Sequence, residues 1–153
     1  MGGTAVVAVA VLTGTSGVAS ASTPRHETIQ LDAVQTSFAI SVNNAPKNQI
    51  NPGDSFVFSE KLYKAGTKTR VGTDYVQCTQ ITKVRAQCLA TFGLNNRGKI
   101  TVQGVLNTSA NVDSTLAVTG GTAEFRAAQG TFTVHSSPDN DPVTHQTFQL
   151  VLP

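Results

Sequence analysis

The sequence predicts an all-β protein whose strands close into an eight-stranded antiparallel β-barrel. Apolar and polar residues alternate in short runs along most of the chain, which is the pattern of strands with one buried face. Glycine and asparagine separate several of these runs, as at Asn95–Gly98 and Gly120–Gly121, and suit turns with positive φ angles. Many short strands in one small domain leave exposed edges, and closure into a barrel removes them.

The alternation defines about eight strand regions and no convincing helix. The first region, Thr28–Val42, shows the pattern twice, with a break near Thr36–Ser37. A hairpin is expected in Leu116–Gly130, where Gly120–Gly121 makes the corner and the second strand resumes at Phe125. The remaining strands are expected at Ser55–Lys64, Arg70–Thr82, Gln87–Leu94, Ile100–Leu106 and Thr144–Leu152.

Composition and motifs exclude several classes of function. The chain has 153 residues, enough for one domain, and only 13% are charged, with a net charge of +2. Such a low charge argues against nucleic acid and against an anionic membrane surface as partners. His26, His135 and His145 do not have the spacing of metal ligands, so no metal site is predicted. No phosphate-binding loop or nucleophile elbow occurs, and we expect no cofactor.

The first 21 residues differ from the rest and predict a secretory signal peptide. An apolar run, Ala5–Leu12, is followed by small residues that end in Ala19-Ser20-Ala21, which resembles a cleavage site. The run is too short to span a bilayer, and no Lys or Arg precedes it. A disordered tail rich in Ala and Gly is the alternative. With cleavage after Ala21, residues 22–153 form a single barrel domain that is secreted.

The two cysteines are expected to form a disulfide. Cys78 and Cys88 lie in neighbouring predicted strands joined by a short connection around Thr82–Arg85. Folding that connection as a hairpin places the two roughly opposite each other, within reach of a disulfide, and an oxidising compartment would favour the bond. Two buried free thiols are the alternative.

Glu60 is the first candidate for a reactive group. Strand alternation places it on one face with Phe56, Phe58 and Leu62. If that face lines the barrel, burial raises the pKa of the carboxyl, which suits a general acid or base. If the face points outward, Glu60 is a charge at the rim of a subunit interface. Tyr75 is a second polar candidate in or near the cavity.

Two segments resemble known barrel families. Gly53–Tyr63 (GDSFVFSEKLY) followed by Arg70-Val71-Gly72 is similar to plant allene oxide cyclases, and Leu116–Gly130 (LAVTGGTAEFRAAQG) resembles the dirigent-protein signature. In the plant enzymes an asparagine immediately before K-L-Y holds the catalytic water, and here that position is Glu60. Cys78 matches a free pocket cysteine of the same pattern, a part that it cannot play in a disulfide. The resemblance covers Gly53 to Val134.

The dirigent resemblance adds two candidates and an assembly. Glu124 and Arg126 match a region where dirigent-like barrels use acidic residues and arginine to handle a reactive quinone methide, although Ala123 and Gln129 depart from the signature. An exposed ion pair is the alternative for Glu124 and Arg126. Because both families are trimers of barrels packed side by side, the resemblance also implies a homotrimer.

These observations predict a secreted isomerase or cyclase that folds a small, unsaturated, apolar molecule in its barrel. Glu60, Tyr75, Glu124 and Arg126 are the candidate catalytic residues. The residues expected to contact the ligand are Phe56, Phe58, Cys78 and Phe92. A non-catalytic binder of apolar metabolites is the alternative, because it needs the same cavity without a titrating acid. A structural protein with a barrel filled by side chains is the third reading.

Overall fold

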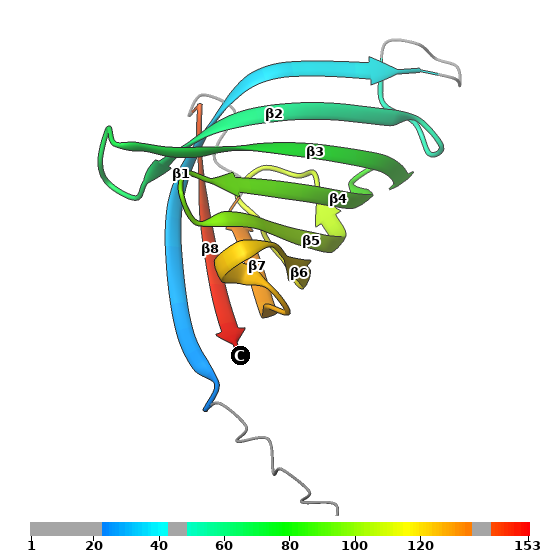
Figure 1. Ribbon diagram of the computed structural model, residues 1–153. Coiled ribbons are helices and arrows are strands. Elements are labelled where there is room, and N and C mark those ends of the chain that lie inside the picture. The colour runs from blue at the N-terminus through cyan, green and yellow to red at the C-terminus, as the bar shows by residue number, and fades with distance from the viewer. Residues whose placement is uncertain (1–22, 43–48, 136–141) are drawn as a thin grey trace, which may run out of the picture.

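Eight antiparallel strands pair in chain order, and the last strand returns to the first to close the barrel (Figure 1). The computed structural model describes residues 23–42, 49–135 and 142–153. The strands are β1 (Arg25–Ser41), β2 (Ser55–Lys64), β3 (Arg70–Thr82), β4 (Arg85–Leu94), β5 (Gly98–Asn107), β6 (Asp113–Gly121), β7 (Gln129–His135) and β8 (Val143–Leu152). The predicted fold class is therefore confirmed, while the expected signal peptide lies outside the described residues.

The long strand β1 closes the barrel because it pairs with two strands. Its first part, Arg25–Val34, pairs with β8, and its second part, Leu31–Ser41, pairs with β2. The register shifts between Gln35 and Ser37, at the break in the alternation that the sequence shows. A β-bulge bends a strand and increases its twist, which lets β1 turn from one partner to the other.

Three phenylalanines fill the middle of the barrel. The ring centroids of Phe92, Phe132 and Phe148 lie 4.9, 4.9 and 4.7 Å apart, and all three side chains are buried. Leu62 and Ile100 are also fully buried. Aromatic rings in tilted and edge-on contact stabilise a core beyond the area that they bury. Phe92 and Phe132 line one pocket of the barrel, and a second pocket shares no lining residue with it.

The hairpin near Gly120–Gly121 differs from the prediction. Both glycines belong to β6, the chain then makes a 3-10 turn at Ala123–Phe125, and β7 begins only at Gln129. A Cβ atom on Gly121 would lie 2.4 Å from the Lys99 carbonyl oxygen and 2.7 Å from the Phe125 Cβ atom. Glycine is thus required at 121 for close approach of the buried Phe125, and not for a tight two-residue turn.

The predicted disulfide between Cys78 and Cys88 is present. The two residues are direct partners in the β3–β4 ladder, and their sulfur atoms lie 2.03 Å apart. Both side chains are buried on the interior side of the barrel. The connection between the strands is as short as expected, because β3 ends at Thr82 and β4 begins at Arg85. Cys78 is therefore not the free pocket thiol that the cyclase pattern implies.

Candidate functional site

A cavity of about 180 Å³ lies inside the barrel, toward the end that carries the β3–β4 turn. Most of its wall is apolar and comes from strands β2 to β7, with Phe58, Phe92 and Phe132 as the aromatic members. One side is polar and holds Glu60 and Asp74. The polar residues Gln35, Thr144 and Gln146 complete the lining on the side of β1 and β8. A mostly apolar cavity with a few converging polar groups is typical of a small-molecule site.

Glu60, Asp74 and Gln146 form the polar wall. Glu60 and Asp74 are partners in the β2–β3 ladder, and the Glu60 backbone N–H donates to Asp74 Oδ1 over 3.0 Å. Gln146 Nε2 donates to Glu60 Oε2, also over 3.0 Å. The three residues are 6%, 0% and 3% exposed. Gln146 lies on β8 and Glu60 lies on β2, and β1 runs between these two strands. The β1 residue that points inward at this place is Ala33, whose side chain is small.

Burial makes the two carboxyls share a proton. Loss of hydration raises the pKa of Asp74 to about 9, and the negative charge of Glu60 and a hydrogen bond with its side chain add to the effect. Burial also raises the pKa of Glu60, against the hydrogen bonds from Asp74 and Gln146. Adjacent buried carboxyls do not both ionise readily. At neutral pH the pair therefore keeps a proton, on Asp74.

Two buried oxygen atoms of this wall have no hydrogen-bond partner among the described residues. Asp74 Oδ2 and Gln146 Oε1 make no hydrogen bond to any described residue, although both residues line the cavity. An unpaired buried polar atom costs about 1–3 kcal/mol, so a molecule that pairs with it gains that amount. Protonated Asp74 can donate from Oδ2, and Gln146 Oε1 can only accept. The wall thus fits a ligand that carries both an acceptor and a donor.

Solved structures with known roles share this architecture. A pyocyanin demethylase is 26% identical over 81% of this chain and 99% of its own, with a TM-score of 0.68. A pterocarpan synthase dirigent protein is 13% identical over 93% and 97%, with a TM-score of 0.70. An exo-specific intermolecular Diels–Alderase is 13% identical over 83% and 98%, with a TM-score of 0.66. The chain has the fold of the dirigent and cyclase barrels. No family model and no curated protein sequence matches it.

This result confirms, at the level of the fold, the resemblance to dirigent and cyclase barrels. The predicted site residues lie partly in the cavity and partly outside it. Glu60, Phe58 and Phe92 line the cavity, as expected. Phe56 does not line it, because its ring is buried between Phe38 and Phe58, with centroid distances of 6.0 and 6.4 Å. Cys78 is also absent from the lining, and its disulfide partner Cys88 takes that place.

Tyr75 is not near the cavity of the barrel, so that prediction is wrong. Its side chain is 66% exposed on the outer face of β3. The reason is the strand period, because Tyr75 lies between Asp74 and Val76, whose side chains both point inward to the cavity. A tyrosine in that position is a surface residue.

Glu124 and Arg126 also lie outside the cavity. Residues Ala123–Phe125 form a 3-10 turn instead of a strand, so positions 124 and 126 do not share a strand face. Glu124 forms its ion pair with Arg97, where Oε2 accepts from Nε over 2.8 Å. Arg126 is exposed at the end of the turn. Neither candidate catalytic residue therefore lies at the cavity, and the alternative of an exposed Glu124–Arg126 ion pair is wrong in its partner.

The sequence-based selection missed Asp74 and Gln146. The sequence does contain a sign of Asp74. This residue lies on the same face of β3 as Val76 and Cys78, and an aspartate on an apolar face is unusual. Gln146 shares the phase of Phe148 and Leu150 along β8. Alternation shows that both point inward, but it does not show that they meet Glu60.

The histidines of the described barrel serve no metal site. His135 Nδ1 lies 2.6 Å from Asp113 Oδ1, and His145 Nδ1 lies 2.8 Å from Asp32 Oδ1, both on the outside. Within residues 23–42, 49–135 and 142–153, no group of three His, Cys, Asp or Glu residues is placed to hold a metal ion. The same residues include no helix of the length and hydropathy needed to cross a membrane.

The raised pKa of Asp74 predicts that stability falls with pH. Below pH 3.8, its ordinary value, the carboxyl is protonated in both the folded and the unfolded chain. Between that value and about 9, only the folded protein keeps the proton. The free energy of unfolding therefore decreases as pH rises through this window, by at most about 1.4 kcal/mol per pH unit from this group. Urea unfolding between pH 5 and pH 8 measures the slope, and Asp74→Asn should flatten it. An equal slope in the variant would contradict the assignment.

Proposed function

We propose that this barrel is a small-molecule isomerase or cyclase that uses Glu60 and Asp74 to move a proton on an unsaturated, largely apolar ligand. The observation that carries the proposal is the buried acid pair, which opens into an apolar cavity. A carboxylate beside a carboxylic acid supplies a base and an acid in one place. The Diels–Alderase and the pterocarpan synthase dirigent protein, which have the same fold, support a cyclase-like role.

The proposed step needs no co-reactant. The Glu60 carboxylate removes a proton from a carbon atom of the ligand, and protonated Asp74 donates a hydrogen bond to the oxygen on which negative charge develops. Return of the first proton to a different carbon atom completes an isomerisation. A donor that is already oriented in a cavity of low polarity stabilises such charge more than water does. Gln146 holds Glu60 in position through its 3.0 Å hydrogen bond.

The volume of the cavity limits the reacting part of the ligand. An engineered cavity of about 150 Å³ in another protein binds benzene, and the cavity here has a volume of about 180 Å³. One ring-sized group therefore fits beside the acid pair. The remainder of a larger molecule would lie at the polar mouth near Gln35 and Thr144.

A second candidate function is removal of a methyl group from an aromatic metabolite. It is favoured by the 26% identity to the pyocyanin demethylase, which extends over 99% of that protein. Pyocyanin therefore belongs in the first panel of substrates. Mass spectrometry of the ligand would distinguish the two reactions, because demethylation lowers its mass by one CH₂ unit and isomerisation leaves its mass unchanged.

Mass spectrometry and proton exchange test the proposal. Native mass spectra of protein purified from its host identify retained ligands, and a panel of cyclic enolisable ketones, phenols and pyocyanin is then incubated in D₂O. We expect deuterium to enter a ligand at the carbon next to its oxygenated carbon, and Glu60→Gln to stop this exchange while binding persists. Binding without exchange or turnover in the unmodified protein would favour the non-catalytic binder.

We further propose a homotrimer formed through the outer face of β2 to β5. The exposed apolar residues Val57, Tyr75, Leu89 and Val105 lie on this face. Their direct neighbours across the strands are uncharged, as in the rows Val57–Gln77–Leu89–Gln103 and Ser59–Tyr75–Thr91–Thr101. A contiguous uncharged face suits burial against another copy. Light scattering should give three times the chain mass, and a monomer at micromolar concentration would contradict the proposal.

Secretion is proposed on the basis of the apolar Ala5–Leu12 run, the Ala19-Ser20-Ala21 sequence and the disulfide. The intact mass of protein from culture fluid should correspond to a chain that begins near Ser22. A chain that stays in the cells with its first 21 residues would contradict it.

A further inference from the structure

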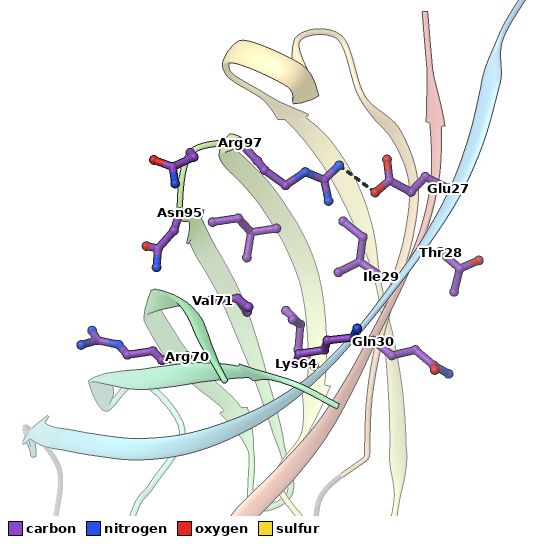
Figure 2. Close-up of a pocket in the computed structure, with 12 residues that line it drawn as sticks. Glu27, Thr28, Ile29, Gln30, Lys64, Arg70, Val71, Asn95 and Arg97 are labelled. Carbon is purple, nitrogen blue, oxygen red and sulfur yellow. Dashed lines mark hydrogen bonds and ion pairs between the residues drawn. The ribbon is translucent and has the colours of Figure 1, made fainter. Parts of the chain in front are cut away.

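A second pocket, of about 490 Å³, lies at the opposite end of the barrel (Figure 2). It is formed by the start of β1 and by the β2–β3 and β4–β5 turns, and it shares no lining residue with the cavity of the acid pair. We propose that this pocket binds a small carboxylic acid with an apolar tail, independently of Glu60 and Asp74. Its volume lies in the usual range for small-molecule sites, about 300–1,000 Å³.

The pocket exists because β1 extends past the end of β2. The β1–β2 ladder begins at Leu31, which pairs with Lys64, so Glu27–Gln30 lie beyond the end of the ladder. Beyond this ladder, the Ala65 N–H in the β2–β3 turn donates to the Gln30 carbonyl oxygen of β1 over 3.3 Å. Ile29 and Val71 point into the space between β1 and the β4–β5 turn (Figure 2). These side chains, with Leu31 and Leu94, give the pocket an apolar floor.

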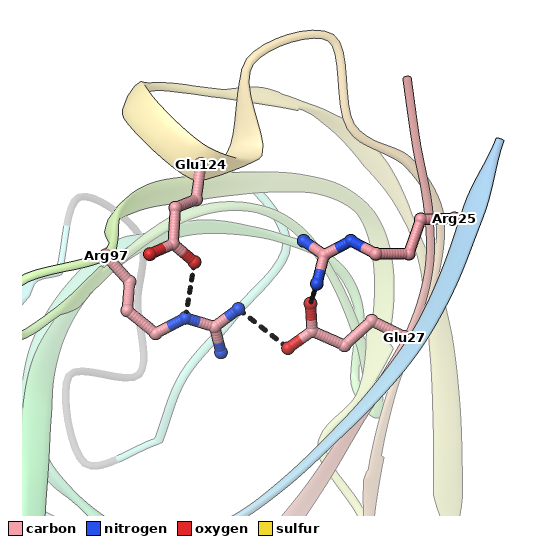
Figure 3. A network of polar contacts seen from close by, with 4 residues as sticks. All are labelled: Arg25, Glu27, Arg97 and Glu124. Atoms are coloured by element: carbon pink, nitrogen blue, oxygen red, sulfur yellow. Dashed lines mark hydrogen bonds and ion pairs between the residues drawn. The ribbon is translucent and has the colours of Figure 1, made fainter. Parts of the chain in front are cut away.

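Arg97 is held between the carboxylates of Glu27 and Glu124 (Figure 3). Its Nη2 donates to Glu27 Oε1 over 2.7 Å, and its Nε donates to Glu124 Oε2 over 2.8 Å. The guanidinium carbon also lies 4.9 Å from the centre of the Phe125 ring. The third nitrogen, Nη1, makes no hydrogen bond to a described residue and points toward the pocket floor (Figure 2). Two N–H donors of a rigid cation thus face an apolar space.

The charges around the pocket favour an anion. Lys64, Arg70 and Arg97 line it together with Glu27, and Glu124 beside the lining also pairs with Arg97, so the positive charge of the pocket lies on Lys64 and Arg70. Glu27 is already paired with Arg97, and its Oε2 lies 3.3 Å from Arg25. Lys64 forms no ion pair within the described part of the chain. A carboxylate can therefore bind between Arg97 Nη1 and the Lys64 amine while its tail covers Ile29 and Val71.

The two pockets should select opposite charges. The first cavity is lined by two carboxyl groups and by no lysine or arginine, whereas Lys64 and Arg70 line the second pocket. A carboxylic acid should consequently bind only at the end that carries Arg97. Substitution of Glu60 or Asp74 should leave its binding unchanged, so failure of the proposed reaction would not affect this test.

Decanoate is the probe, with decanol and decylamine as neutral and cationic controls of the same chain length. Isothermal titration of the full chain should show decanoate binding at least about tenfold more tightly than either control, the expected effect of one charge-assisted hydrogen bond. Backbone NMR should place the largest shift changes at Ile29 and Val71. Equal affinity for decylamine, or shift changes at Ala90 and Val102 of the other cavity, would overturn the proposal.

Variants of two neighbouring lysines separate a specific site from general charge. Lys64→Glu should weaken decanoate binding about tenfold or more. Lys68→Glu makes the same charge change in the same turn, at a residue outside the lining, and should leave binding within about twofold. Val71→Phe should abolish binding by filling the floor, and a circular dichroism spectrum checks its fold. Equal losses for the two lysine variants, or full binding by a folded Val71→Phe protein, would contradict the site.

Discussion

A Glu60→Gln variant is expected to lose roughly a hundredfold to ten-thousandfold in turnover, the usual contribution of a general base. The amide keeps the shape of the side chain and can still pair with Gln146, but it cannot accept a proton from carbon. Ligand affinity should change little, because the apolar wall of the cavity is intact. The measurement is kcat and Kd on the substrate that the D₂O panel identifies.

Glu124→Gln is the matched control for that experiment. It makes the same chemical change at a carboxylate outside the cavity, where the partner is Arg97. Turnover in this variant should stay within about twofold of the unmodified protein, because an exposed ion pair contributes little. A Glu60→Gln protein with normal turnover, or a Glu124→Gln protein that loses turnover equally, would remove Glu60 from the mechanism.

Phe92→Ala should lower the free energy of unfolding by about 3–5 kcal/mol, the typical effect of removing a buried aromatic ring. The ring contacts both Phe132 and Phe148, each at a centroid distance of 4.9 Å, and forms part of the cavity wall. Its loss leaves a space that the closed barrel cannot easily fill. Urea unfolding measures the change.

Phe38→Ala is the control for Phe92→Ala, because Phe38 is 49% exposed and lies outside the central cluster. Its effect should be below about 1 kcal/mol, as for most surface substitutions. Similar losses in the two variants would mean that the three-ring cluster is not the centre of the fold.

Alternation and turn residues were sufficient to predict the barrel and its disulfide, and they placed Glu60 on one face with Phe58 without deciding whether that face points inward. These features depend on one strand or on one hairpin. Cys78 and Cys88, for example, are separated by ten positions, and a short turn brings them together. The same local rule, applied to Asp74, places this residue on one face with Val76 and Cys78.

Contacts across the barrel could not be predicted in this way. Gln146 and Glu60 are 86 positions apart in the sequence, and their hydrogen bond depends on the pairing of β1 with both β8 and β2. The pairing of Arg97 with Glu27 spans 70 positions and depends on the same closure. The turn at Ala123–Phe125 was mistaken for strand because Gly120–Gly121 resembles a hairpin corner, whereas the close packing of Phe125 requires Gly121.

Carboxyl ¹³C NMR of the full chain across the pH range tests the central claim, that Glu60 and Asp74 share one proton inside the barrel. We expect one carboxyl signal, absent in Asp74→Asn, to stay protonated at neutral pH and to titrate with a pKa of about 9. The Glu60 signal should shift its pKa in the same variant, because the two groups interact. Ionisation of both Asp74 and Glu60 at the ordinary values, about 3.9 and 4.3, would contradict the shared proton and leave the proposed reaction without its acid.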